Sequence, residues 1–525
     1  MPLGIDSIQT IVIVGGGAAG WLTANHLARE FQSKSLSNVK ITLIESPNIP
    51  TIGVGEGTVP SIRDSLQHFG ISETDLIQRC NASFKQSIEF VGWQPDDISG
   101  QQHRYQHIFD YPRCKHPAAI HDWLHKGYQS ANFSDTFSIQ SHFIAKGLGP
   151  KRFTQAEYQG LCSYAYHFDA GKFGELLAEN AVQRLGVIHK RTEITAILGD
   201  QEDGIASLLT LEQERIEADL FIDCSGARSL LLGDFLKVPF VAKNHMLFTD
   251  TALATQIPNT SANASVPCST IATAHKAGWI WDIGLSNRRG IGIVYSSSHM
   301  SDIDAEVELN NYIGSASFES TRKIPMRAGY YEQFWQANCV AIGMSQGFVE
   351  PLEATGLLMY DKSAQLLAQT LKNLNSEVDD IHTAMQRQAN HFNTTLRGVW
   401  DSVFDFIKLH YCISQRQDSQ FWLDHQDPNT CSANLREYLR LWQHQLPKES
   451  SFSTSPSVFN LNNYLYVLLG MGFKPNSEHV DWVTEDHSSQ MHLSVMQQLT
   501  GELSPGLLNH RALLDQIQAH GLQKI

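Results

Sequence analysis

The hydrophobic pattern of the first 45 residues predicts a strand, a glycine-rich turn, a helix and a second strand. Residues 10–14 form a short apolar run of mostly β-branched residues, which is typical of a buried parallel strand. The stretch GGGAAG at 15–20 follows, and residues 21–31 then show a helical pattern. A second apolar run, 39–44, ends at Glu45. This order predicts one βαβ unit at the start of the chain.

The pattern changes from mixed to helical near residue 355. Upstream, it predicts helices at 62–69, 73–82 and 173–185, and strands at 192–198, 205–211, 215–222, near 280, at 291–295 and at 339–343. Downstream, the helical period dominates, and helices are predicted at 357–374, 378–413 and 434–445. We therefore predict an α/β fold with a mixed domain over residues 1–355 and a mostly helical C-terminal region over residues 356–525.

One segment of the mixed domain lacks a regular pattern. Residues 94–151 are irregular and rich in His, Tyr, Phe and Trp. Irregular aromatic segments inside a domain often face a substrate. We interpret residues 94–151 as a substrate-facing insertion.

The glycine turn after the first strand predicts a dinucleotide site. In the spacing G-x-G-x-x-G, the first glycine allows a tight turn, the second lets backbone approach a pyrophosphate, and the third lets the helix meet the sheet. The residues concerned are Gly15, Gly17, Ala18, Ala19 and Gly20. The helix N-terminus offers unpaired N–H groups to the phosphates, and a carboxylate at Glu45 is placed to accept hydrogen bonds from ribose hydroxyls.

Two later strand–glycine turns favour FAD over NAD as the dinucleotide. One ends at Gly226 and the other runs into Gly343 and Met344. In two-domain flavoproteins such turns approach the flavin, and NAD alone would not explain them. The chain has one convincing glycine-rich fingerprint, so we expect reduced FAD to come from a separate NAD(P)H-dependent flavin reductase.

Composition narrows the function classes. The net charge is −15 and no Lys/Arg run of five occurs, which argues against a nucleic-acid partner. No apolar stretch approaches the ~18 residues of a membrane helix, so we expect no membrane partner. The eight cysteines are scattered without C-x-x-C spacing, and no N-terminal signal is evident. We therefore expect reduced thiols, no metal site and a cytoplasmic location.

Six stretches together resemble the flavin-dependent halogenase family, whose best known members act on tryptophan. They are GGGAAGW at 15–21, GVGEGTVP at 53–60, CNASFK at 80–85, YHFDA at 166–170, WIWDI at 279–283 and FVEPLEATG at 348–356. The chain departs from the family pattern at three positions. Gly284 stands in place of a proline, Ala354 in place of a serine, and Tyr464 in place of a tryptophan.

The resemblance implies an FAD-binding, two- or three-layer domain like that of flavoprotein monooxygenases, with the helical C-terminal region closing the substrate pocket. It implies that Lys85 and Glu353 are catalytic, and that Thr355 and Gly356 bind halide through backbone N–H groups. Further positions matched to the family are substrate-contacting His107, Phe109 and Tyr464, and flavin-contacting Ser46, Ile49 and Gly57.

The implied reaction places chloride or bromide on an electron-rich aromatic, indole or tryptophan-like. An arene is a nucleophile, so halide must first be oxidised, here to a hypohalous species at the expense of reduced FAD and oxygen. Lys85 would guide the halogen, through a hydrogen bond or as a haloamine, and Glu353 would remove the ring proton.

Other interpretations stay open at this point. A flavin-dependent monooxygenase that hydroxylates an aromatic substrate would share the fold, and so would a flavin-binding protein without turnover. The substrate range includes free indole, tryptophan, a tethered aromatic and a phenol. The sequence does not determine the halide preference, the ring position or the oligomeric state, and a homodimer is one arrangement that it allows.

Overall fold

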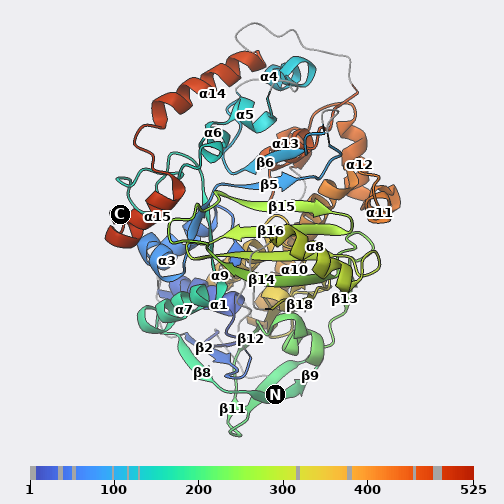
Figure 1. Cartoon of the computed structure of the whole chain (residues 1–525). Coiled ribbons are helices and arrows are strands. Elements are labelled where there is room, and N and C mark those ends of the chain that lie inside the picture. The colour runs from blue at the N-terminus through green and yellow to red at the C-terminus, as the bar shows by residue number, and fades with distance from the viewer. Residues whose placement is uncertain are drawn as a thin grey trace.

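A six-stranded sheet built around the N-terminal strand forms the nucleotide-binding part of the fold (Figure 1). A computed structural model describes residues 8–32, 39–49, 55–96, 100–114, 117–127, 131–314, 320–374, 381–452, 457–476 and 488–524. All neighbouring strands of this sheet are parallel except the first pair. Their order is β20 (Trp335–Gln336), β21 (Cys339–Ala341), β12 (Leu220–Asp223), β1 (Thr10–Val14), β2 (Lys40–Glu45) and β8 (Ile188–Arg191).

The predicted βαβ unit is confirmed. Strand β1 pairs in parallel with β2, from Thr10 opposite Lys40 to Val14 opposite Ile44. Helix α1 (Ala18–Gln32) connects them and begins three residues earlier than its hydrophobic pattern indicated. Helix α1 packs against α2 (Ile62–Phe69), α7 (Ala170–Glu179) and the π-helical turn Asn180–Arg184. It also packs against α9 (Thr355–Leu374) from the C-terminal region.

A seven-stranded, mostly antiparallel sheet lies across the middle of the molecule (Figure 1). Its order is β18 (Arg322–Pro325), β14 (Thr251–Pro258), β17 (Arg288–Tyr295), β16 (Gly278–Gly284), β15 (Ser269–His275), β5 (Ser87–Val91) and β6 (Arg104–Ile108). Helix α8 (Asp302–Ile313) packs on β17. The described residues also form three small three-stranded sheets. In the first, β10 (Gly204–Thr210) lies between β9 (Ile194–Asp200) and β11 (Arg215–Ile216). In the second, β19 (Gly329–Tyr331) lies between β13 (Phe240–Ala242) and β22 (Gly347–Phe348), and in the third, β7 (Ala165–Asp169) lies between β3 (Gly55–Gly57) and β4 (Ser83–Lys85).

Three local predictions need correction. The helix predicted at 73–82 is α3 (Glu73–Arg79), and it stops because Asn81 adopts a left-handed φ of 50°. The strand predicted at 215–222 is split, since the carboxylate of Asp219 leaves the strand to accept hydrogen bonds from the backbone N–H groups of Gln9 and Thr10. The segment predicted to be irregular, 94–151, contains β6, α4 (Pro117–Asp122), α5 (Phe133–Phe137) and α6 (Ile139–Ala145).

The C-terminal region is helical, as predicted. After α9 come α10 (Ile381–Cys412), α11 (Gln420–Gln426), α12 (Ala433–Trp442), α13 (Leu461–Gly470), α14 (Ser489–Leu503) and α15 (His510–His520). Residues 378–380 of one predicted helix lie outside the described residues. Helices α13 and α14 cover β6, α5 and α6 at one end of the molecule, whereas α15 packs beside α3 (Figure 1). One apolar core contains side chains of both α1 and α9, so the helical region shares a core with the nucleotide-binding sheet.

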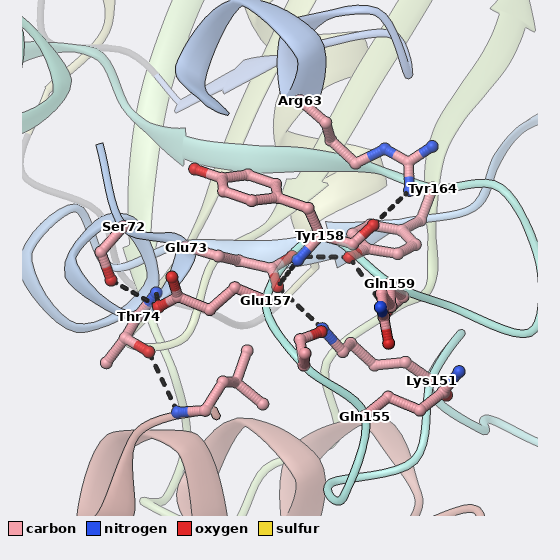
Figure 2. A network of polar contacts seen from close by, with 12 residues as sticks. Arg63, Ser72, Glu73, Thr74, Lys151, Gln155, Glu157, Tyr158, Gln159 and Tyr164 are labelled. Carbon is pink, nitrogen blue, oxygen red and sulfur yellow. Dashed lines mark hydrogen bonds and ion pairs between the residues drawn. The ribbon is translucent and has the colours of Figure 1, made fainter. Parts of the chain in front are cut away.

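A buried ion pair fixes the loop that leads into β7. Lys151 and Glu73 are fully buried, and the Lys151 ammonium lies 2.8 Å from the Glu73 carboxylate (Figure 2). The same carboxylate accepts hydrogen bonds from the hydroxyls of Tyr164 and Tyr166 and from the backbone N–H of Tyr158. Because Tyr166 belongs to β7, this network anchors the strand that pairs with β4.

We expect Glu73→Gln to destabilise the protein by about 3–5 kcal/mol, because it leaves a buried ammonium without its counter-ion. Chemical denaturation followed by tryptophan fluorescence measures the effect. The matched control is Glu179→Gln, since Glu179 pairs with Arg79 on the surface. We expect little change in that control. Equal losses in both variants would contradict a structural role for the buried pair.

Candidate active site

The glycine turn after β1 has the geometry of a dinucleotide site. A Cβ on Gly15 would lie 2.1 Å from the carbonyl oxygen of Cys224, and a Cβ on Gly20 would lie 1.9 Å from the carbonyl oxygen of Gly15. These two positions therefore require glycine for the tight turn and for the approach of helix to strand. Gly17 faces open space, with no atom within 4 Å of its Cβ position, which is the room that a pyrophosphate needs. The residues present therefore fit the phosphates of FAD, with Ala18 and Ala19 starting α1.

The two later strand–glycine turns meet the first one at the carboxyl edge of the sheet. Gly343 follows β21 with a φ of 89°, and its Cβ would lie 2.6 Å from the Cβ of Ala19. A Cβ on Gly226 would lie 3.8 Å from Cε of Met344. Ligands of parallel α/β sheets bind at this edge. The structure thus places Gly343 beside Ala19 at the start of α1, and Met344 beside Gly226.

The positions matched to ribose and flavin contacts lie near the same edge. Glu45 ends β2 with its carboxyl carbon 2.4 Å from the Cβ position of Gly16, and it is hydrogen-bonded to Nε2 of His189 at 2.8 Å. The Ser46 hydroxyl donates to Glu193, and the side chain of Ile49 is 75% exposed. Residues 53 and 54 of the GVGEGTVP motif lie outside the described residues.

Lys85 lies in a buried site next to Gly57. It ends β4, and its side chain is fully buried. Its Nζ makes no hydrogen bond to any described residue and lies 5.4 Å from the ring centre of Phe109. The Cβ position of Gly57 is 3.3 Å from this Nζ. Burial lowers the pKa of Lys85 to about 7, although the negative charge of Glu353 works in the opposite direction.

Two histidines for which the sequence predicted no role form hydrogen bonds to residues near Lys85. His510, the first residue of α15, accepts a hydrogen bond from the backbone N–H of Phe84 at 3.0 Å and bonds the carbonyl oxygen of Val266 through its other ring nitrogen. His167 bonds Thr270 at 2.7 Å and lies beside the Cβ position of Gly57. Burial, reinforced by the charge of Lys85, holds the pKa of His167 well below its usual value, so the ring is neutral.

Glu353 is clamped between two buried histidines. Its carboxylate lies 2.9 Å from Nδ1 of His107 and 2.9 Å from Nε2 of His410. Burial alone would raise the pKa of Glu353, yet the bonds from His107 and His410 hold it lowered to about 2. His410 comes from α10, and nothing in its sequence context distinguished it from an ordinary helical residue.

The three positions matched to substrate contacts lie in one neighbourhood. The side-chain amide nitrogen of Asn463, the residue before Tyr464, lies 3.0 Å from Nε2 of His107. Phe109 is half-buried and faces Lys85. Tyr464 is buried, with its ring 4.9 Å from that of Phe406. The polar atoms of His107 are thus engaged with protein groups, and its ring centre lies 6.1 Å from that of Phe406 and 6.0 Å from that of Tyr466.

The predicted halide position is the start of α9. Thr355 and Gly356 are the first two residues of this helix, where backbone N–H groups have no partner within the helix. The Thr355 hydroxyl is buried without a hydrogen bond to the described residues. A helix N-terminus with an unsatisfied hydroxyl offers donors to an anion. Glu353 lies two residues upstream, so the proposed halide and base positions are adjacent.

One departure from the family pattern has a local explanation, and a second lies at a strained turn. Gly284 ends β16, and a Cβ there would lie 2.6 Å from Cδ of Pro267, so this position has no room for a larger residue. Ala354 adopts a left-handed φ of 55°, an uncommon conformation for a residue with a Cβ. Such strain often occurs at functional turns, and this one separates Glu353 from Thr355.

Within the described residues, no helix is long and apolar enough to cross a bilayer. The same part of the chain contains no group of three His, Cys, Asp or Glu side chains arranged to hold a metal ion.

Comparison with known proteins agrees with this geometry. A family model described as tryptophan halogenase matches residues 10–485. The chain is 34% identical over 486 residues to tryptophan 6-halogenase SttH of Streptomyces toxytricini, covering 88% of this chain and 89% of that protein. A tryptophan halogenase structure from Shewanella frigidimarina NCIMB 400 is 39% identical, with a TM-score of 0.91 over 99% of both chains. BrvH, a flavin-dependent halogenase from Brevundimonas sp. BAL3, is 30% identical, with a TM-score of 0.83 over 98% of this chain and all of that one.

These matches extend over nearly the whole chain and include both the nucleotide-binding sheet and the helical region. They support halogenation, and not hydroxylation or passive flavin binding. The chain belongs to the tryptophan halogenase family of flavin-dependent enzymes.

Proposed function

We propose that this halogenase places bromide or chloride on an indole-type aromatic, either indole itself or a tryptophan-like compound. Two buried side chains carry the proposal. The Lys85 Nζ has no hydrogen bond to the described residues, and the negative charge of Glu353 acts on it. When bound, reduced FAD would supply with oxygen the oxidation that turns halide into hypohalous acid.

The proposed cofactor contacts follow the carboxyl edge of the six-stranded sheet. Gly15, Gly17, Ala18, Ala19 and Gly20 would hold the phosphates, and Glu45 the ribose. Flavin contacts would come from Ser46, Ile49, Gly57, Gly343 and Met344. The N–H groups of Thr355 and Gly356 would hold halide. The proposal includes a domain boundary at residue 355/356, at the start of α9. It also includes a substrate-facing role for residues 94–151 and a separate flavin reductase that supplies reduced FAD.

Lys85 receives the halogen as a neutral amine. An ammonium has three donors that all need acceptors, whereas the Lys85 Nζ has no hydrogen-bond partner among the described residues. Attack of the amine nitrogen on hypohalous acid forms an N–halogen bond and releases water, which balances the reaction. The halogen is thereby held at one place in the pocket, next to the ring of Phe109.

Glu353 takes the proton that the ring loses. Transfer of the halogen to a ring carbon breaks the N–halogen bond, and the Lys85 nitrogen keeps the bonding electron pair and takes up a proton from solvent to become an amine again. The ring becomes cationic, and the anionic carboxylate stabilises that charge. The ring C–H bond then breaks, its electron pair restores the aromatic system, and the proton passes to Glu353. His107, Phe109 and Tyr464 would form walls around the aromatic substrate.

A bromination assay tests the proposed function. The protein is incubated with FAD, a flavin reductase, NADH, oxygen and bromide, with indole, tryptophan or a phenol as substrate. We expect a brominated indole-type product, and we expect Lys85→Ala to lose at least about 10²-fold in rate while it still binds FAD. Lys172→Ala, which changes an exposed lysine of α7, is the control and retains the rate. An oxygenated product without bromine would reject halogenation.

The bromination rate should depend on the ionisation of Lys85. Because burial lowers the pKa of Lys85 to about 7, the amine form increases as pH rises through that value. We expect the rate, measured with an excess of reduced FAD, to rise with pH across this range and then level off. A rate that falls as the pH passes 7 would show instead that the ammonium form acts, by a hydrogen bond to hypohalous acid.

Removing the charge of Glu353 should slow turnover without loss of FAD. We expect Glu353→Gln to reduce the bromination rate by about 10²-fold or more, the usual contribution of a positioned base. FAD binding is followed by flavin fluorescence. Glu332→Gln, at an exposed glutamate, is the matched control and keeps the wild-type rate. Unchanged turnover in Glu353→Gln would remove this residue from the mechanism.

A further inference from the structure

Both ring nitrogens of His410 face groups that accept hydrogen bonds. Nδ1 lies 2.9 Å from the backbone carbonyl oxygen of Phe406, and Nε2 lies 2.9 Å from Oε1 of Glu353. A carbonyl oxygen is only an acceptor, so Nδ1 carries a hydrogen. A neutral imidazole has a single N–H. A second hydrogen must therefore lie between His410 and Glu353, either on Nε2 or on the carboxyl oxygen.

The environment of His107 indicates where that second hydrogen lies. Oδ1 of Asn463 accepts the backbone N–H of Asn460 at 2.8 Å, within the capping box that starts α13, so the amide nitrogen of Asn463 must face His107. That amide donates to Nε2 of His107, which leaves the hydrogen of His107 on Nδ1. Nδ1–H then points at both oxygens of Glu353, each 2.9 Å away.

Glu353 thus accepts a hydrogen bond from Nδ1–H of His107. This bond favours the ionised carboxylate over the neutral acid. We infer that His410 is a doubly protonated imidazolium in the resting enzyme. We infer that it is the positioning residue that keeps the buried carboxylate of Glu353 ionised. This inference rests on the proposed role of Glu353 as the base.

The charges of the pair make such deep burial tolerable. His410 and Glu353 are 0% and 2% exposed, and an isolated charge at that depth would be strongly disfavoured. Together they are neutral, and their hydrogen bonds compensate for the lost hydration. A carboxylate with such a low pKa is a weak base, but the cationic ring intermediate is a strong acid, so a weak base is sufficient. The carboxylate stays charged until that intermediate forms.

Four other titratable groups face the pair from neighbouring elements. His107 and Tyr105 come from β6, Lys85 comes from β4, and Glu350 is hydrogen-bonded to Tyr411, the residue after His410. Burial raises the pKa of Tyr105 well above its usual value, so its hydroxyl is neutral. Burial also raises the pKa of Glu350 to about 7. None of these groups supplies the hydrogen between His410 and Glu353.

Nitrogen NMR of the protein labelled with ¹⁵N-histidine tests the inference without any turnover. We expect the His410 ring, assigned with His410→Phe, to show hydrogens on both nitrogens throughout the neutral pH range. In Glu353→Gln, we expect His410 to become neutral, with its hydrogen on Nδ1. A neutral His410 ring in the wild-type enzyme would overturn the inference.

The pH dependence of bromination is a second test. In His410→Phe the carboxyl of Glu353 loses its charged partner, so its pKa should rise toward neutrality. Below this raised pKa of Glu353, the rate of His410→Phe relative to wild type should fall about tenfold for each pH unit. This loss adds to the pH dependence that the ionisation of Lys85 causes in both proteins. His410→Gln, whose amide can donate to Glu353, should restore part of the rate. His275→Gln, at a buried histidine that bonds the backbone of Val294 and Ala277, is the control and should leave the shape of the profile unchanged.

The outcomes separate this inference from the proposed function. If Glu353→Gln keeps the wild-type rate, the base assignment is wrong, whatever His410 does. If Glu353→Gln loses the rate and His410→Phe keeps the wild-type pH profile, only the role of His410 is wrong. Loss of the rate in Glu353→Gln together with the extra acid dependence in His410→Phe supports both.

Discussion

The structure depends on keeping one carboxylate charged at a position buried inside the protein. Glu353 is 2% exposed, and its ionised form persists because two imidazole rings donate to it from different parts of the chain. His107 reaches it from the edge strand of the seven-stranded sheet, and His410 reaches it from the long helix α10. Lys85 has no such partner among the described residues, so its ammonium is disfavoured there. Burial and local contacts thus favour the anionic form of Glu353 and the amine form of Lys85.

Local features of the fold could be predicted from the sequence, because their causes are local. The βαβ unit follows from apolar runs and from glycines whose Cβ atoms would collide with backbone. The end of α3 depends on the left-handed backbone of Asn81, and the break before β12 depends on an Asp219 that caps the sheet from a distance. Neither effect leaves a periodic signal. Hydrophobic patterning therefore located many of the elements, misplaced some of their ends and missed the strand and helices within residues 94–151.

The site was only partly predictable for a similar reason. Lys85 and Glu353 were suggested by resemblance, and the structure brings them into electrostatic contact. His410, His167 and Asn463 were not assigned roles, because their importance arises from contacts between segments far apart in the sequence. The hydrogen position on His107 is determined by an amide in the cap of α13, and no motif describes such an arrangement. Proton positions follow from tertiary packing and not from spacing along the chain.

The bond between His510 and the backbone of Phe84 links the last helix to the strand that carries Lys85. During synthesis the N-terminal part of a chain emerges and begins to fold first. The nucleotide turn needs only residues from the first two thirds of the chain, whereas the lysine strand is secured by a residue within the final helix. Ribosomal order therefore allows the glycine turn to form before the strand that carries Lys85 is secured.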